Sequence, residues 1–258
     1  MISFRHLLIL LCGSMLIMSS GASLALEAKS GYEYIKPATR AMQDDDFENP
    51  GMLAVERGLE LFNNKQAGAR QACAECHGED GINMDKKSIA RYPIVDESNS
   101  AIMTLQQTIG ECRKRTGSQA LPANHADLVA LETFVRNLAI GEVVDVQTDG
   151  AAAALLEQGE AIFKTRYGLI DMSCAHCHSM YTGLMIRGQR ISQGQANGFP
   201  AYRLDIGEMT NLEQRIQQCL TSMRAEPFPA DSEEIELLGL YLMSRSNGLK
   251  IETPAVRY

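Results

Sequence analysis

The sequence predicts an all-α protein made of two tandem domains that are related by internal duplication. One observation is a repeat of about half the chain, in which glycines, aromatic residues and cysteines recur at matched spacings. The other is the helical spacing of the apolar residues around these matched positions. The matched pairs include Gly58 and Gly159, Phe62 and Phe163, Leu105 and Leu212, Gln107 and Gln214, Ile109 and Ile216, Cys112 and Cys219, Leu131 and Leu238, and Phe134 and Tyr241.

The helices can be placed in order along the chain. Val55, Leu59 and Phe62 lie at helical spacing and predict a helix early in the first half. Residues 210–213 resemble a capping box, and apolar residues at helical spacing follow them, so a helix is expected to begin there. Residues 231–248 predict the last helix, opened by an aspartate and ended by a glycine.

The remaining segments divide the chain. Residues 1–25 have a positive start, a short apolar run and small residues before a cleavage site, which predicts a signal peptide and export to a bacterial periplasm. Residues 26–50 are expected to form an extended arm over the first domain. The domains are residues 51–141 and 151–258, and residues 142–150, which lack helical periodicity, are the expected linker. No later stretch is long and apolar enough for a membrane anchor.

The overall charge argues against one class of partner. The chain has a formal net charge of -8 at pH 7. An acidic surface does not favour binding to nucleic acid or to anionic lipid, so neither is expected as a partner. A local basic pocket could still bind a small anion.

Two C-x-x-C-H motifs indicate the chemistry of the protein. This spacing places two thiols on one helical turn, where they can form thioethers with the vinyl groups of haem, and the following histidine becomes the proximal ligand of the iron. A zinc half-site or a redox dithiol is the alternative for a single C-x-x-C. Two copies with histidine, in an exported chain, favour two covalently attached haem c groups and two cytochrome c-like domains. The motif residues are Cys73, Cys76 and His77, and Cys174, Cys177 and His178.

The second axial ligand of each iron is expected to be a cysteine. None of the 13 methionines stands at equivalent positions in the two halves, whereas Cys112 and Cys219 do. A thiolate is a strong anionic donor that stabilises ferric iron and lowers the reduction potential. A disulfide between the two cysteines is the alternative, but their matching places in the repeat favour two His/thiolate haems.

One difference between the halves bears on function. Arg215 stands four residues before Cys219, so both side chains can share one helix face, whereas Thr108 stands four residues before Cys112. A guanidinium beside a sulfur atom suits a small oxyanion, because its fork matches paired anionic oxygens. Arg215 could instead hold a haem propionate. The asymmetry suggests that the second haem is catalytic and that the first relays electrons or supports the fold.

At these residues the chain resembles the SoxA family, the dihaem cytochrome subunits of the bacterial thiosulfate-oxidising Sox system. The resemblance extends over nearly the whole mature sequence. Its most specific stretches are residues 193–200 and 215–227, and residues 38–43 and 49–51 match as well as both haem motifs.

The resemblance implies an activity and a set of roles. Members of the family form a heterodimer with a monohaem cytochrome, SoxX, and conjugate thiosulfate oxidatively to a cysteine of the SoxYZ carrier, as L-cysteine S-thiosulfotransferases. Two electrons leave through haem to a soluble cytochrome c. Carried over to this sequence, His77 and Cys112 are the axial ligands of one iron, and His178 and Cys219 those of the other. Cys219 is also the nucleophile, as a persulfide, and Arg215 binds thiosulfate.

Two other functions are compatible with the same motifs. A thiosulfate dehydrogenase that forms tetrathionate would use the same His/thiolate chemistry, although residues 193–200 favour the SoxA family. A dihaem electron-transfer cytochrome without a substrate is the third possibility.

Overall fold

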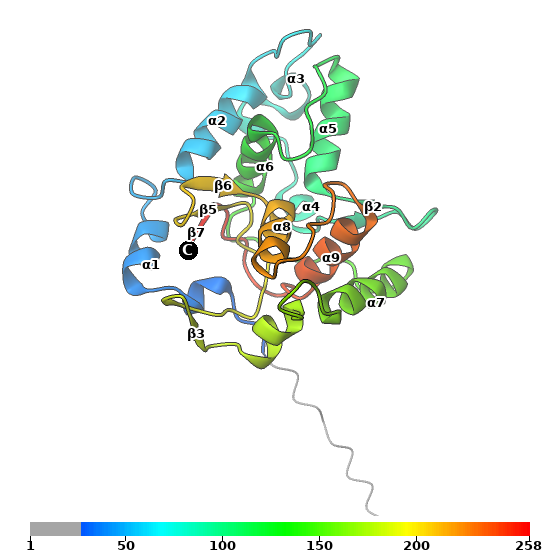
Figure 1. The fold of residues 1–258 in the computed structure, drawn as a ribbon. Coiled ribbons are helices and arrows are strands. Elements are labelled where there is room, and N and C mark those ends of the chain that lie inside the picture. The colour runs from blue at the N-terminus through cyan, green and yellow to red at the C-terminus, as the bar shows by residue number, and fades with distance from the viewer. Residues whose placement is uncertain (1–26) are drawn as a thin grey trace, which may run out of the picture.

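The computed structural model describes residues 27–258, in which the two halves share one hydrophobic core (Figure 1). The predicted signal peptide lies outside the described residues. In Figure 1 the first half, in cyan and green, lies above the second half, whose helices run from green to red. None of the helices described is long and apolar enough to cross a membrane. The predicted all-α class is confirmed, with short strands added to the helices.

The elements follow each other in two similar series. The arm contains η1 (Gly31–Tyr34) and α1 (Pro37–Asp44). The first half contains α2 (Met52–Asn63), α3 (Ala74–His77), η2 (Glu79–Gly81), α4 (Lys86–Ala90), β1 (Ile94–Val95), β2 (Ile102–Met103), α5 (Leu105–Thr116) and α6 (Ala126–Leu138). The second half contains α7 (Ala151–Lys164), η3 (His176–Met180), β3 (Met185–Ile186), β4 (Gln189–Arg190), β5 (Ala201–Arg203), β6 (Glu208–Thr210), α8 (Leu212–Ser222), α9 (Glu233–Ser244) and β7 (Ala255–Arg257).

A close helix crossing frames each half, and a glycine makes it possible. α2 packs on α6, and α7 packs on α9 in the same way. A Cβ atom added at Gly58 would lie 2.2 Å from the carbonyl oxygen of Ala130, and one added at Gly159 would lie 2.3 Å from that of Leu237. Such contacts are far inside van der Waals distance, so only glycine lets the two backbones touch. The repeat predicted from the sequence is therefore a repeat of helix packing.

An aromatic pair supports each crossing. The ring centroids of Phe62 and Phe134 lie 5.2 Å apart in the first half, and those of Phe163 and Tyr241 lie 5.3 Å apart in the second. Both pairs are tilted, an arrangement that aromatic rings prefer to a face-to-face sandwich. All four residues are matched positions of the repeat.

The helices that carry the second cysteines begin with matching capping boxes. Thr104 caps α5 and Asn211 caps α8, and in each helix the side chain of the third residue, Gln107 or Gln214, accepts a hydrogen bond from the cap backbone. The sequence placed the second box one residue too early, at Thr210, because threonine and asparagine are both good caps. Thr210 instead ends strand β6.

The last helix is shorter than predicted. Ser232 caps α9, and the helix ends at Ser244 rather than at Gly248. Asp231 has a positive φ of 57° and belongs to the preceding turn. Gly248, with φ of 86°, lies in a second turn beyond the helix.

A three-stranded sheet was not predicted from the sequence. β5 lies in the middle, pairs antiparallel with β6, and pairs parallel with β7 at the C-terminus. Each strand has three residues, which is too short to show an alternating pattern. The sheet matters for the site because it holds Arg203 at the end of β5.

The N-terminal arm packs on the second half, so the prediction of an extended arm over the first domain is wrong. The arm is partly helical, and α1 contacts β7 (Figure 1). The Asn49 side chain donates to the carbonyl oxygen of Pro254 at 2.9 Å, and the Gln43 side chain accepts from the backbone N–H of Val256 at 3.0 Å. These polar side chains satisfy backbone groups along the C-terminal strand, which binds the arm to that side.

The segment expected to be a linker is packed into the structure. Val144 and Val146 are almost completely buried. The backbone N–H of Asp145 donates to Ala90 in the first half, and that of Val144 donates to Leu249 in the second. Residues 142–150 therefore connect the halves with Val144 and Val146 in the core, while residues 148–150 are exposed.

The helix crossing predicts a stability defect. Gly159→Ala should lower the free energy of unfolding by about 1–3 kcal/mol, because its methyl group has to displace the backbone of α9. Gly239→Ala is the matched control, since nothing lies within 4 Å of a Cβ at that position. The control should be neutral or stabilising by up to about 1 kcal/mol. Denaturant unfolding of the haem-loaded protein measures both values, and equal stability of the two variants would contradict this packing.

Candidate active site

The second C-x-x-C-H motif ends with its histidine fixed in one orientation. His178 lies in η3, a π-helical turn, and its Nδ1 lies 2.9 Å from the carbonyl oxygen of Ser192, to which it donates. The backbone of Gly194 packs against the same ring, where an added Cβ would lie 2.9 Å from the imidazole. With the proton on Nδ1, Nε2 is the nitrogen that offers a lone pair, which is the arrangement that metal-binding histidines use.

Helix α8 brings a cysteine to this histidine. Arg215 and Cys219 lie one turn apart on α8 and both are partly buried. Burial raises the pKa of Cys219, but the charge of Arg215, the hydrogen bond and charge of His178, and the charge of Arg203 lower it more, to about 7. The residues predicted to form the site are thus brought together.

The motif cysteines of this half behave differently. Burial and the nearby Cys219 raise the pKa of Cys174 to about 12, and the same two causes raise the pKa of Cys177. These two thiols are therefore held protonated, beside a third whose environment favours the thiolate. Cys112 and Cys219 are both free, so the alternative of a disulfide between them is not what the structure shows.

Arg203 is a site residue that the sequence reasoning missed. It ends β5, its side chain is 5% exposed, and its charge acts on Cys219 together with that of Arg215. It has no counterpart in the repeat and lies far from Cys219 in the chain. The one sequence feature that could have pointed to Arg203 is its position between the two stretches most specific to the family, residues 193–200 and 215–227.

The first half repeats the arrangement with another arginine. Cys112 lies near Cys73, whose pKa is raised by burial and also by the neighbouring Cys112. The guanidinium of Arg115 donates to the Cys112 sulfur at 3.4 Å. The expectation of a first site without an arginine is therefore wrong, because Arg115 follows Cys112 by three residues, whereas Arg215 precedes Cys219 by four, and both spacings lie on one helix face. Arg115 is exposed, whereas Arg203 is buried and Arg215 is half-buried.

The residues of both halves fit a covalently attached haem. Each half offers two motif thiols on one turn, one imidazole from the motif and one thiol from the helix opposite. Imidazole nitrogen and thiolate sulfur are both axial ligands of haem iron in proteins. In the second half the fixed His178 ring and the thiolate-favouring surroundings of Cys219 supply both donors in the form that binds iron.

Comparisons with known proteins agree with this geometry. A family model described as the SoxA/TsdA cytochrome c domain matches residues 57–144 and 158–251, once in each half. The chain belongs to the SoxA/TsdA cytochrome c family. This confirms the duplicated cytochrome c fold and the resemblance to SoxA, and a cytochrome c domain implies covalently bound haem c.

The SoxA relatives match almost the whole chain. The L-cysteine S-thiosulfotransferase subunit SoxA of Rhodovulum sulfidophilum is 38% identical over 90% of this chain and 80% of the relative. The subunit of the same name from Pseudaminobacter salicylatoxidans is 36% identical over 90% of this chain and 81% of the relative. The crystal structure of SoxXA from P. pantotrophus matches with a TM-score of 0.80 and 36% identity, covering 89% of this chain and 86% of that one.

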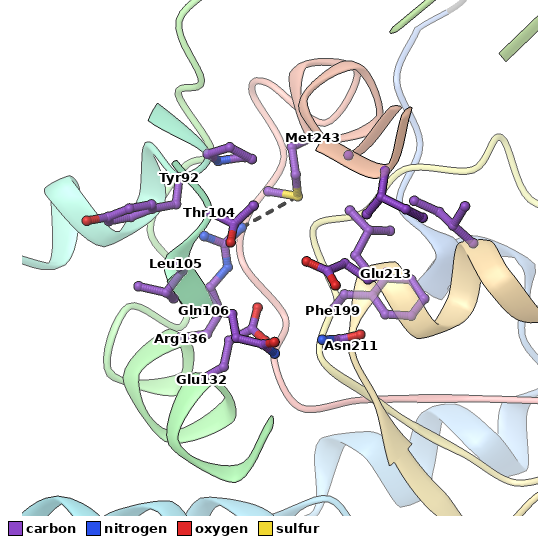
Figure 2. A pocket seen from close by; sticks show the side chains of 15 residues that line it. Tyr92, Thr104, Leu105, Gln106, Glu132, Arg136, Phe199, Asn211, Glu213 and Met243 are labelled. Atoms are coloured by element: carbon purple, nitrogen blue, oxygen red, sulfur yellow. Dashed lines mark hydrogen bonds between the residues drawn. The ribbon is translucent and has the colours of Figure 1, made fainter. Parts of the chain in front are cut away.

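A separate cavity, lined mainly by apolar side chains but also by two carboxylates, lies between the halves of this SoxA-family chain (Figure 2). Its volume is about 60 Å³, and Glu132 of α6 and Glu213 of α8 both line it. The side chain of Gln106 donates to the Glu132 carboxylate at 3.0 Å, whereas Glu213 Oε2 is buried without a hydrogen-bond partner. Gln106 and Glu213 are equivalent positions of the repeat, so matching positions of the two capped helices line the same cavity.

The cavity carboxylates are shifted toward the neutral form. Burial is the main cause that raises the pKa of Glu132 to about 7, against the lowering effects of Gln106 and Arg136. Burial, with the charges of Glu132, Asp231 and Glu236, raises the pKa of Glu213 to about 8. Two carboxyl groups that face each other in a confined space resist simultaneous ionisation.

The two buried carboxyl groups of the cavity predict that the free energy of unfolding depends on pH. Folding raises both pKa values above the ordinary 4.5, so the folded state binds more protons than the unfolded state between about pH 4.5 and 8. The free energy of unfolding should fall as pH rises through this window. Glu213→Gln should flatten the fall and leave the protein more stable than the wild type at pH 9, by an amount on the order of a few kcal/mol.

Denaturant titrations from pH 5 to 9 provide the measurement. Glu208→Gln is the matched control, because it removes an exposed carboxylate from the same half. Parallel pH curves for the wild type and Glu213→Gln would show that this carboxyl is not shifted.

Proposed function

We propose that this chain is the dihaem subunit of an L-cysteine S-thiosulfotransferase. It conjugates thiosulfate to a cysteine of the SoxYZ carrier in the periplasm and carries two haem c groups. The names of its SoxA relatives support the activity. One observation of the structure carries the proposal: α8 presents Arg215 and Cys219 on one face, with the Cys219 sulfur against the fixed imidazole of His178.

The axial and attachment residues are proposed for both haems. Cys73 and Cys76 attach the first haem, and Cys174 and Cys177 attach the second. His77 with Cys112, and His178 with Cys219, would be the ligands of the two haem irons. When bound, the haems supply one-electron acceptors close to the reacting sulfur.

The residues around Cys219 define the substrate step. Arg215 binds the sulfonate oxygens of thiosulfate through its guanidinium, which leaves the terminal sulfur directed toward Cys219. Cys219, in the thiolate or persulfide form, is the nucleophile that forms an S–S bond to this sulfur. Because both sulfur atoms start as electron-rich nucleophiles, forming this bond releases two electrons, which the haem c acceptors would take up. The carrier thiolate then attacks the same substrate sulfur, and the Cys219 sulfur leaves, as in thiol–disulfide exchange.

The overall reaction balances as an oxidation. One carrier thiol and one thiosulfate dianion give S-thiosulfocysteine, one proton and two electrons. The new bond joins the carrier sulfur to the terminal sulfur of thiosulfate, and the sulfonate remains attached. The electrons pass to haem c acceptors and from there to a soluble cytochrome c.

The partners follow from the same proposal. The solved relative is named SoxXA, and it supports a heterodimer of this chain with a monohaem SoxX subunit. The SoxYZ carrier approaches Cys219 with its own cysteine, and thiosulfate is the small substrate.

Substitution of Arg215 tests the proposed function. Arg215→Ala should leave haem content and the absorption spectrum unchanged but lower the rate of thiosulfate transfer by roughly 100-fold, because the sulfonate loses a charge-assisted anchor. The intact mass of the carrier after incubation with thiosulfate and an oxidised cytochrome c measures the transfer. Lys250→Ala, which removes an exposed cation from the same half, is the control and should behave as the wild type.

The products separate this proposal from its alternatives. Wild-type turnover that yields rapid tetrathionate without any carrier would contradict the transferase activity. Unchanged transfer by Arg215→Ala would remove Arg215 from the mechanism.

A further inference from the structure

Arg203 is a buried cation without a full counter-charge. The residue is 4% exposed, and its Nε is buried without a hydrogen-bond partner. Its nearest carboxylate oxygen, Oδ1 of Asp205, lies 3.5 Å from Nε, and the Asp205 side chain is 41% exposed. That contact is too long for a good hydrogen bond and is weakened by solvent. A buried charge of this kind normally has a partner, because leaving water is costly for an unpaired ion.

The neighbouring arginines show which charges remain unpaired. Arg257, beside Arg203 on the sheet, pairs with Glu252 at 2.8 Å. Arg215 takes part in none of the ion pairs formed by the described residues. Arg203 and Arg215 lie close enough that each opposes the charge of the other, and both act on the Cys219 sulfur. The guanidinium groups of Arg203 and Arg215 thus both act on the Cys219 sulfur. Among the described residues, their one ion-pair contact is the weak one between Arg203 and Asp205.

We infer that Arg203 is a second substrate-binding residue, which holds the sulfonate group of thiosulfate together with Arg215. The inference rests on the proposed function and specifies its substrate site. Two guanidinium groups match the charge of a dianion, and their forks can bind separate oxygens of one sulfonate. The arrangement selects dianionic sulfur oxyanions over monoanions such as nitrate, because a monoanion would leave one guanidinium uncompensated.

The two arginines reach the site from different elements, so their side chains differ in conformational freedom. Arg215 lies on a partly buried helix face, whereas Arg203 is fixed by the middle strand of the sheet. A guanidinium that is already immobilised loses little conformational entropy when the anion binds. Arg203 therefore sets the position of the sulfonate, and Arg215 closes on it beside Cys219.

Arg203→Met tests the inference in the haem-loaded protein with its monohaem partner. The KM for thiosulfate should rise by about 10- to 100-fold, the range expected for losing a charge-assisted hydrogen bond. The haem content and absorption spectrum should not change. Arg203→Lys should recover part of the affinity, because it keeps the charge but loses the fork. Lys250→Met, the exposed control, should leave KM unchanged.

A binding measurement keeps the inference separate from the proposed function. Thiosulfate and sulfate are titrated without carrier, and the change in haem absorbance reports occupancy beside Cys219. The wild type should bind both dianions and discriminate against nitrate, and Arg203→Met should lose most of this discrimination. If the wild type shows this binding but never transfers thiosulfate, the proposed function fails while the assignment of Arg203 stands.

Two results would overturn the assignment of Arg203. The first is a wild-type KM and wild-type dianion binding in Arg203→Met. The second is loss of haem or an altered haem spectrum in both Arg203→Met and Arg203→Lys, since Arg203 would then hold a haem propionate.

Discussion

Backbone contact between crossing helices is the constraint on which each half of this protein depends. Gly58 and Gly159 allow α2 to touch α6 and α7 to touch α9. The crossing fixes the helix that precedes each haem motif relative to the helix that closes the half. With these two helices fixed, the motif and the cysteine-bearing helix have only a narrow range of positions. A small error at the crossing would therefore reach the site through the packing of the core.

The duplicated framework carries different chemistry in its two halves. Both halves hold a motif thiol near a second cysteine, and both supply an arginine to that cysteine. In the first half the arginine is exposed and approaches from the following turn of the helix. In the second half the sheet adds a buried guanidinium to the one on α8. A buried pair of cations can bind a small anion more strongly than an exposed one, because less water competes for it. This difference supports the proposal that the substrate site lies in the second half.

Sequence reasoning succeeded where the signal was local. The repeat, the haem motifs and the placing of Arg215 beside Cys219 depend on short spacings within a helix. It failed where contacts join distant segments. The arm was placed on the wrong half because Gln43 and Asn49 bond to a strand more than 200 residues away. Arg203 was missed for the same reason, since a three-residue strand has no periodicity and its neighbour β7 is the C-terminus.

The central proposal is that Cys219 and His178 together would hold the iron of the reactive haem. Electron paramagnetic resonance of the oxidised, haem-loaded protein at low temperature tests it most directly. The wild type should show two low-spin ferric signals of the His/thiolate type, and Cys219→Met should remove one of them while both haems stay attached. Signals of the His/Met type in the wild type, or two unchanged thiolate signals in Cys219→Met, would contradict the claim.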